Sequence, residues 1–266
     1  MYPIIALAGP TGTGKTAIAI AAAKATGAII LPLDQLQRYQ YLREGVGFNE
    51  NAFGGVDHRG YQVLSPWEVS GPARYAEWLR STVQIEARDR PVLIEGGCTS
   101  YLTRILELHG SDPIFRHVEC VALNAPADAK VALSKIETLY DMEKILRIIR
   151  EVEDLERRGF VSEAGLSFLE ECEDLFVHPE HEDRNLAWAI RISAKVYCPA
   201  YLALKGRIEV HNARKRIVRN IRAIQIYQQQ RVAALLPWNR RTPSERPMQA
   251  VMRLVSGLQG REAPGK

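Results

Sequence analysis

The segment richest in chemical information is Gly9-Pro10-Thr11-Gly12-Thr13-Gly14-Lys15-Thr16, which fits the pattern G-x-x-x-x-G-K-[ST] at every fixed position. Its glycines let successive backbone N–H groups turn toward one phosphate, and a helix that follows adds the positive end of its dipole. Lys15 supplies a mobile positive charge, and the Thr16 hydroxyl is expected to hold Mg²⁺. The segment therefore predicts a phosphate-binding loop but does not identify the phosphate compound.

A second candidate group follows the next apolar run. Asp34 comes directly after Ala28–Leu33, and Gln37 stands three residues further on. A carboxylate beside a phosphate loop can hold Mg²⁺ through water or accept a proton from an acceptor substrate, and an amide can contact a nucleobase edge. The competing interpretation is a helix cap by Asp34 with Gln37 on the surface.

A scaffold of strands and helices must position these residues. Apolar runs over Tyr2–Ala8, Ala28–Leu33, Pro91–Ile94 and His117–Leu123 predict strands, and the alanine-rich Ala17–Thr26 predicts a helix. Short buried strands that alternate with helices indicate a parallel α/β sheet, whose ligands bind at the carboxyl ends of the strands. Asp34 and Glu95 both fall at such ends.

The remaining chain divides into a loop, a helical region and a tail. Arg43–Gly71 has no helical period and predicts a long functional loop or lid. Apolar residues at spacings of three and four predict a helix over Met142–Arg158, and further helices are expected over Leu186–Val196 and Ala213–Leu236. We expect an α/β core over residues 1–126, a smaller helical region over 127–236, and a tail over 237–266 that is loosely ordered or holds a helix at Met248–Leu258.

Composition narrows the class of protein. The 266 residues are 46% hydrophobic and 25% charged, as in folded globular proteins. Apolar stretches fall short of the ~18 residues of a membrane span and no basic leader is evident, so we expect neither membrane insertion nor secretion. The cysteines form no Cys-x-x-Cys pair, which favours a reducing cytoplasm; they are Cys98, Cys120, Cys172 and Cys198.

The net charge of +4 conceals an uneven distribution. Residues 1–183 carry a net charge of −10 and residues 184–266 a net charge of +14. This asymmetry suggests that the basic end, above all Arg214–Arg222, meets the phosphates of a nucleotide or of RNA. A solvated helical face is the competing interpretation.

Three segments together resemble the isopentenyltransferase family. They are the phosphate loop, the Asp-x-x-Gln of Asp34 and Gln37, and Pro91-Val-Leu-Ile-Glu-Gly-Gly-Cys-Thr-Ser-Tyr101. The resemblance is specific over residues 4–40 and 91–106 and partial around Ala187–Arg191. It implies a P-loop nucleoside-triphosphatase-like fold, a parallel sheet flanked by helices, that transfers a prenyl group. The family includes tRNA dimethylallyltransferases and the adenylate isopentenyltransferases that begin cytokinin synthesis.

The resemblance also implies residue roles. The phosphate loop holds the diphosphate of dimethylallyl diphosphate, Lys15 and Mg²⁺ neutralise this leaving group, and Thr11 lies near its bridging oxygen. Asp34 takes the proton from the exocyclic amine of adenine, and Gln37 helps to hold the base. The predicted catalytic residues are Asp34, Lys15 and Thr11, and the predicted diphosphate-binding residues are Gly12, Thr13, Gly14, Lys15 and Thr16, of which Thr16 also binds the metal. The predicted acceptor-binding residues are Gln37, Arg214, Lys215 and Lys135. Lys135 is expected to substitute for an arginine that the family has in its middle helix.

Two features favour the adenylate branch of the family. The tRNA enzymes are usually longer, with an inserted helical region, and usually have serine where this chain has Gln35. We therefore expect AMP, ADP or ATP as the acceptor, with tRNA as the alternative that the basic Arg214–Arg222 supports. A small-molecule kinase, which would release ADP, and a non-catalytic nucleotide switch are the remaining alternatives.

Overall fold

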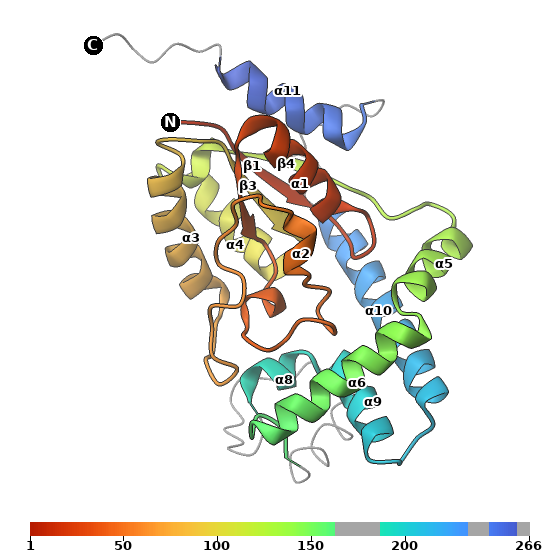
Figure 1. The fold of residues 1–266 in the computed structure, drawn as a ribbon. Coiled ribbons are helices and arrows are strands. Elements are labelled where there is room, and N and C mark those ends of the chain that lie inside the picture. Colours follow the sequence, from red (N-terminus) through yellow and green to blue (C-terminus); the bar gives the residue numbers. More distant parts are fainter. Residues whose placement is uncertain (163–186, 234–244, 260–266) are drawn as a thin grey trace.

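A parallel sheet forms the centre of the α/β part of the molecule (Figure 1). The computed structural model describes residues 1–162, 187–233 and 245–259, and within these residues the sheet has the strand order β2-β3-β1-β4. The strands are β1 (Ile4–Ala8), β2 (Ile29–Pro32), β3 (Val92–Gly96) and β4 (Val118–Ala122). Neighbouring strands are parallel throughout, which confirms the predicted fold class and brings the carboxyl ends of the strands to one edge.

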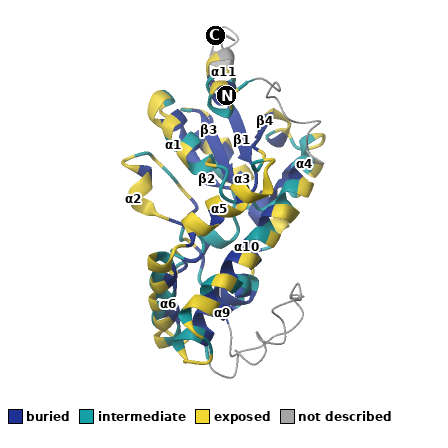
Figure 2. Ribbon diagram, turned by 90° about the vertical axis from the view of Figure 1, so that its right-hand side faces the viewer, coloured by how far each residue is buried: buried dark blue, intermediate teal, exposed yellow. Residues whose placement is uncertain are grey.

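Helices cover both faces of this sheet. They are α1 (Lys15–Thr26) and α11 (Pro247–Gln259) on one face, and α3 (Pro72–Glu86) and α4 (Thr99–His109) on the other. Alternation along β1 explains the two layers, because Ile5 and Leu7 pack toward α1 and α11, whereas Ile4 and Ala6 pack toward α3 and α4. The strands are consequently buried almost without interruption (Figure 2).

A second group of helices has its own apolar core. Its members are α5 (Ala129–Leu139), α6 (Met142–Arg157), α8 (Trp188–Ile192), α9 (Ala194–Leu204) and α10 (Val210–Ala233). The predicted amphipathic helix is α6, whose buried residues Ile145, Ile148, Val152 and Leu155 face α9 and α10. Helix α10 continues from this group to the α/β part, where it contacts α4 (Figure 1).

At the C-terminal end, the structure has one of the two arrangements that the sequence predicts. In the expected tail, Ala250, Val251 and Val255 of α11 are buried against α1 and the sheet. The described part of this tail is therefore the helix expected as an alternative over Met248–Leu258, and it completes one face of the α/β core because its apolar residues share one side. Residues 234–244 and 260–266 lie outside the described residues.

The long segment Arg43–Gly71 has the predicted loop character. It contains one short helix, α2 (Glu50–Phe53), and an aromatic cluster in which the rings of Phe48 and Tyr61 stack at 5.3 Å. This cluster fixes the loop against the sheet. Among the helices that the structure describes, none is both long enough and apolar enough to cross a membrane.

Candidate active site

The phosphate loop joins β1 to α1, as its sequence predicts. Gly12 and Gly14 have φ angles of 79° and 83°, in the left-handed region that favours glycine. Gly14 precedes α1 with no side-chain cap, so the first N–H groups of this helix face the loop without a side-chain acceptor. This geometry provides a site for the oxygens of a phosphate or diphosphate.

Lys15 lies folded back over the loop. Its Nζ donates a hydrogen bond to the Pro10 carbonyl at 2.8 Å, and the Thr13 hydroxyl donates to the same carbonyl at 2.8 Å. Burial lowers the pKa of Lys15, while the nearby Glu95 and Asp34 carboxyls oppose this change. The ammonium group is thus held among oxygens at the position where an anion would need it.

Asp34 follows β2 and starts a tight turn, the 3₁₀ helix η1 (Leu36–Arg38). Its Oδ1 accepts hydrogen bonds from the N–H groups of Leu36 at 2.9 Å and Gln37 at 3.3 Å. Burial raises the pKa of Asp34, and these two N–H groups and Lys15 oppose the rise. The turn orients the carboxylate, and the raised pKa suits a group that must accept a proton.

Glu95 is a further site residue, for which the sequence predicts a place at a strand end but no role. Its carboxylate accepts hydrogen bonds from the hydroxyls of Thr16, at 3.3 Å, and Tyr61, at 3.2 Å. The side chain is buried, and burial raises its pKa against the opposing effect of Lys15. The sequence pattern that could have identified Glu95 as a site residue is the same as for Asp34, an acidic residue directly after an apolar run.

These residues line one cavity of about 480 Å³. The phosphate loop, Asp34, Gln37 and Glu95 form one wall, and the end of α5 with the start of α6 forms the other. Gln37 donates from Nε2 to the Val46 carbonyl at 3.3 Å, so the loop 43–47 also closes the cavity. The structure therefore brings the predicted catalytic residues, Gln37 and the predicted diphosphate-binding residues other than Thr13 to one cavity.

Two basic residues of α6, which the sequence does not single out, also face this cavity. Lys144 and Arg147 both pair with Glu44, at 2.6 and 3.2 Å. An amphipathic pattern places such charges on the wet side of a helix, so nothing in the local sequence separates them from ordinary surface residues.

Helix α10 holds the phosphate loop through glutamines. The Thr11 N–H donates to Oε1 of Gln228 at 2.9 Å, and Nε2 of Gln225 donates to the Thr11 carbonyl at 2.8 Å. Nε2 of Gln228 donates to the Gly97 carbonyl at 2.9 Å. One helix thus bridges the phosphate loop and the loop after β3. No pattern in the local sequence predicts this arrangement.

Three of the predicted acceptor-binding residues do not line the cavity. Arg214 donates to the carbonyls of Tyr140, at 2.8 Å, and Glu137, at 3.1 Å, and so caps the end of α5. Lys135 and Lys215 are exposed on α5 and α10. That Arg214, Lys135 and Lys215 bind the acceptor stays a prediction. It would require a large acceptor that reaches beyond the cavity.

The donor set at the loop fits Mg²⁺. Thr16, Glu95 and Asp34 offer a hydroxyl and two carboxylates to the same cavity, and all three are oxygen donors. Mg²⁺ prefers oxygen ligands and usually takes only one or two carboxylates, with water and substrate phosphates completing its shell.

Comparisons with known proteins agree on one family. Residues 2–184 match the family model described as isopentenyl transferase. A tRNA dimethylallyltransferase of Symbiobacterium thermophilum is 32% identical over 114 residues, which cover 42% of this chain and 36% of that protein. The tRNA dimethylallyltransferase of Bacillus subtilis is 29% identical over 170 residues, 59% of this chain and 54% of that protein. The chain thus spans about half or less of the length of these curated relatives.

A solved structure is similar over nearly the whole chain. The tRNA delta(2)-isopentenylpyrophosphate transferase from Staphylococcus epidermidis superposes with a TM-score of 0.69, covering 98% of this chain and 100% of that one. At 13% identity the likeness concerns the fold.

Proposed function

The chain belongs to the isopentenyl transferase family, and from this premise we propose that it transfers a dimethylallyl group from dimethylallyl diphosphate to the exocyclic amine of an adenine in tRNA. The observation that carries the proposal is one cavity whose wall combines a phosphate loop with the carboxylates of Asp34 and Glu95. This arrangement combines a site for an anionic leaving group with a proton acceptor.

In the proposed reaction, the phosphate loop binds the diphosphate of the donor. The allylic C–O bond breaks, the prenyl fragment gains positive charge, and the diphosphate gains negative charge. Lys15, the N–H groups at the start of α1 and the Thr11 hydroxyl stabilise that developing charge. Mg²⁺ held through Thr16 and Glu95 would supply further neutralisation of the diphosphate.

Asp34 acts on the acceptor in this proposal. An adenine amine is a poor nucleophile, so it must be oriented toward the allylic carbon and lose a proton as the new C–N bond forms. The turn at η1 fixes the Asp34 carboxylate for that proton transfer, and Gln37 beside it can contact the base. The reaction also requires that water be kept from the prenyl cation.

The choice of tRNA as acceptor rests on the relatives. Both sequence relatives described above are named tRNA dimethylallyltransferases, whereas the chain length and Gln35 favour a free adenine nucleotide. The exposed basic side chain of Lys215 on α10 is compatible with a large polyanion, because it lies outside the cavity that a mononucleotide would occupy.

The test is a comparison of acceptors. The protein is incubated with dimethylallyl diphosphate, Mg²⁺ and, separately, unmodified tRNA, AMP, ADP and ATP, and the products are measured by mass. We expect a 68 Da increase of tRNA, about the mass of C₅H₈, together with diphosphate release and no ATP hydrolysis. Prenylated AMP, ADP or ATP without prenylated tRNA would instead establish the adenylate branch, and ADP release would indicate a kinase.

A further inference from the structure

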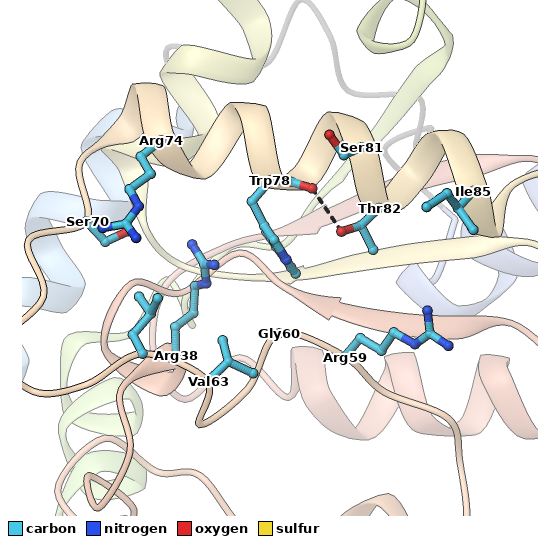
Figure 3. Close-up of a pocket in the computed structure, with 11 residues that line it drawn as sticks. Arg38, Arg59, Gly60, Val63, Ser70, Arg74, Trp78, Ser81, Thr82 and Ile85 are labelled. Atoms are coloured by element: carbon cyan, nitrogen blue, oxygen red, sulfur yellow. Dashed lines mark hydrogen bonds between the residues drawn. The ribbon is translucent and has the colours of Figure 1, made fainter.

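A second cavity lies beside the edge strand β2, between α3 and residues 59–64. Its volume is about 540 Å³, and it shares no lining residue with the active-site cavity. Figure 3 shows Arg74 and Trp78 pointing from α3 toward Arg38, with Ser70 at the same end. The proposed function gives this cavity no role.

Arg38 is the unusual residue of this cavity. Its side chain is 3% exposed, and its Nε has no hydrogen-bond partner. The guanidinium carbon lies 4.2 Å from the ring centroid of Trp78 and 5.4 Å from that of Tyr75. Aromatic faces compensate a buried positive charge only in part, and buried arginine is rare unless an anion pairs with it.

The neighbouring cations already have carboxylate partners. Arg74 pairs with Glu68 at 2.8 Å, and Arg59 pairs with Glu86. Among the residues that the structure describes, no ion pair joins Arg38 to a carboxylate. The cavity therefore carries one positive charge in excess, on a side chain that water barely reaches.

We propose that this cavity binds the phosphate group of a small, free molecule, with Arg38 as the buried anchor and Arg74 at the rim. A guanidinium presents its N–H groups in a fork that matches two phosphate oxygens. The volume is that of a small-molecule site. Because Arg38 is so little exposed, only a compact group that enters the cavity can reach it, which favours a free phosphate compound over the backbone of an RNA.

A phosphate group bound in this cavity would also affect the active site. Arg38 ends the η1 turn that begins after Asp34, and Nε2 of Gln35 donates to the Ser70 carbonyl at 2.6 Å. A phosphate bound between Arg38 and α3 would hold this turn in place. The inference does not depend on which acceptor the active site uses.

The experiment measures binding of inorganic phosphate by calorimetry. All variants carry Lys15→Ala, which weakens the phosphate loop and leaves the second cavity intact. We expect Arg38→Met to raise the Kd for phosphate at least about tenfold and Arg74→Gln to raise it several-fold, as loss of a charge-assisted contact implies. Arg80→Gln is the matched control, because Arg80 also lies on α3, is 52% exposed against 58% for Arg74, and lies outside the cavity.

Three outcomes would overturn the proposal. The first is an equal Kd in all variants, and the second is no measurable phosphate binding once Lys15 is replaced. The third is a loss of tRNA binding in Arg74→Gln with no phosphate binding in any variant, which would assign the cavity to RNA. If Arg38→Met fails to fold, the pair Arg74→Gln and Arg80→Gln still decides the question.

Discussion

At the scale of single residues, the active site is a group of buried, oppositely charged side chains that shift one another's pKa. Burial raises the pKa of Asp34 and Glu95 and lowers the pKa of Lys15, and each of the three opposes the shift of a neighbour of opposite charge. A bound diphosphate would favour the charged form of Lys15, and an adenine amine would meet a carboxylate of increased basicity.

The role of Asp34 can be tested by Asp34→Asn. Asn keeps the shape and the hydrogen bonds of the turn but cannot accept a proton, so we expect kcat to fall by about 10²–10⁴. The Kd of dimethylallyl diphosphate should stay nearly constant, as measured by titration without acceptor. Asp128→Asn, which changes an exposed cap of α5, serves as the control. Unchanged turnover in Asp34→Asn would remove Asp34 from its proposed role.

The role of Glu95 can be tested through Mg²⁺. In Glu95→Gln the Thr16 hydroxyl keeps a hydrogen-bond acceptor, but the site loses a charged oxygen ligand. We expect the Mg²⁺ concentration for half-maximal activity to rise by about tenfold or more. Glu107→Gln on the exposed side of α4 is the control. An unchanged Mg²⁺ dependence would exclude Glu95 from the metal site.

At the scale of elements, α10 connects the helical group to the phosphate loop. Its glutamines hold the backbone of Thr11 and Gly97, so the loop that should bind the donor is positioned from a distant helix. The position of α10 in turn depends on its packing against α6 and α9. Movement of the helical group would therefore change the shape of the phosphate site.

This connection can be tested by Gln228→Glu. The new side chain can still accept the Thr11 hydrogen bond, but it places a negative charge beside the bound diphosphate and cannot donate to Gly97. We expect the KM of the donor to rise by about tenfold, and the effect to shrink at high salt. Gln230→Glu adds the same charge at an exposed position on the same helix. Equal effects of both changes would show that only the overall charge matters.

At the scale of the whole molecule, Glu151 joins the helical group to the loop 43–47 that borders the active site. Its carboxylate accepts hydrogen bonds from the N–H groups of Arg43 and, at 2.9 Å, Gly45. Tyr197 of α9 lies against Gly45, where any Cβ atom would overlap the phenol ring. Burial raises the pKa of Glu151 to about 7. The junction between the two parts thus contains an acid that ionises near neutral pH.

Glu151 should make stability depend on pH. Because its pKa is higher in the folded than in the unfolded state, the folded protein binds more protons between about pH 4.5 and 7. The free energy of unfolding should therefore fall as pH rises through this range, by on the order of 1–3 kcal/mol from this group, and change little above it. Glu151→Gln should flatten this slope in urea unfolding from pH 4.5 to 8. Glu153→Gln on the exposed side of α6 should keep the slope; loss of the slope in both variants would refute the assignment.

The sequence by itself determined the parts of this protein that local residues specify. The phosphate loop from Gly9 to Thr16 is contiguous, so its residue types fix its backbone, and the apolar runs before Asp34 and Glu95 fix their places at strand ends. The parallel sheet follows from these runs, because strands buried on both faces must be apolar throughout.

Only the tertiary structure decided how distant segments complete the site. Thr11 and Gln228 are 217 residues apart, and glutamines on a helix give no sign of what they contact. Lys144 and Arg147 face a cavity because α6 packs against α9 and α10, whereas the sequence pattern assigns such charges to solvent. The burial of Arg38 also depends on tertiary structure, because only the docking of α3 places Trp78 over its guanidinium group and buries its charge. Side-chain environment depends on contacts between elements, and local sequence does not encode those contacts.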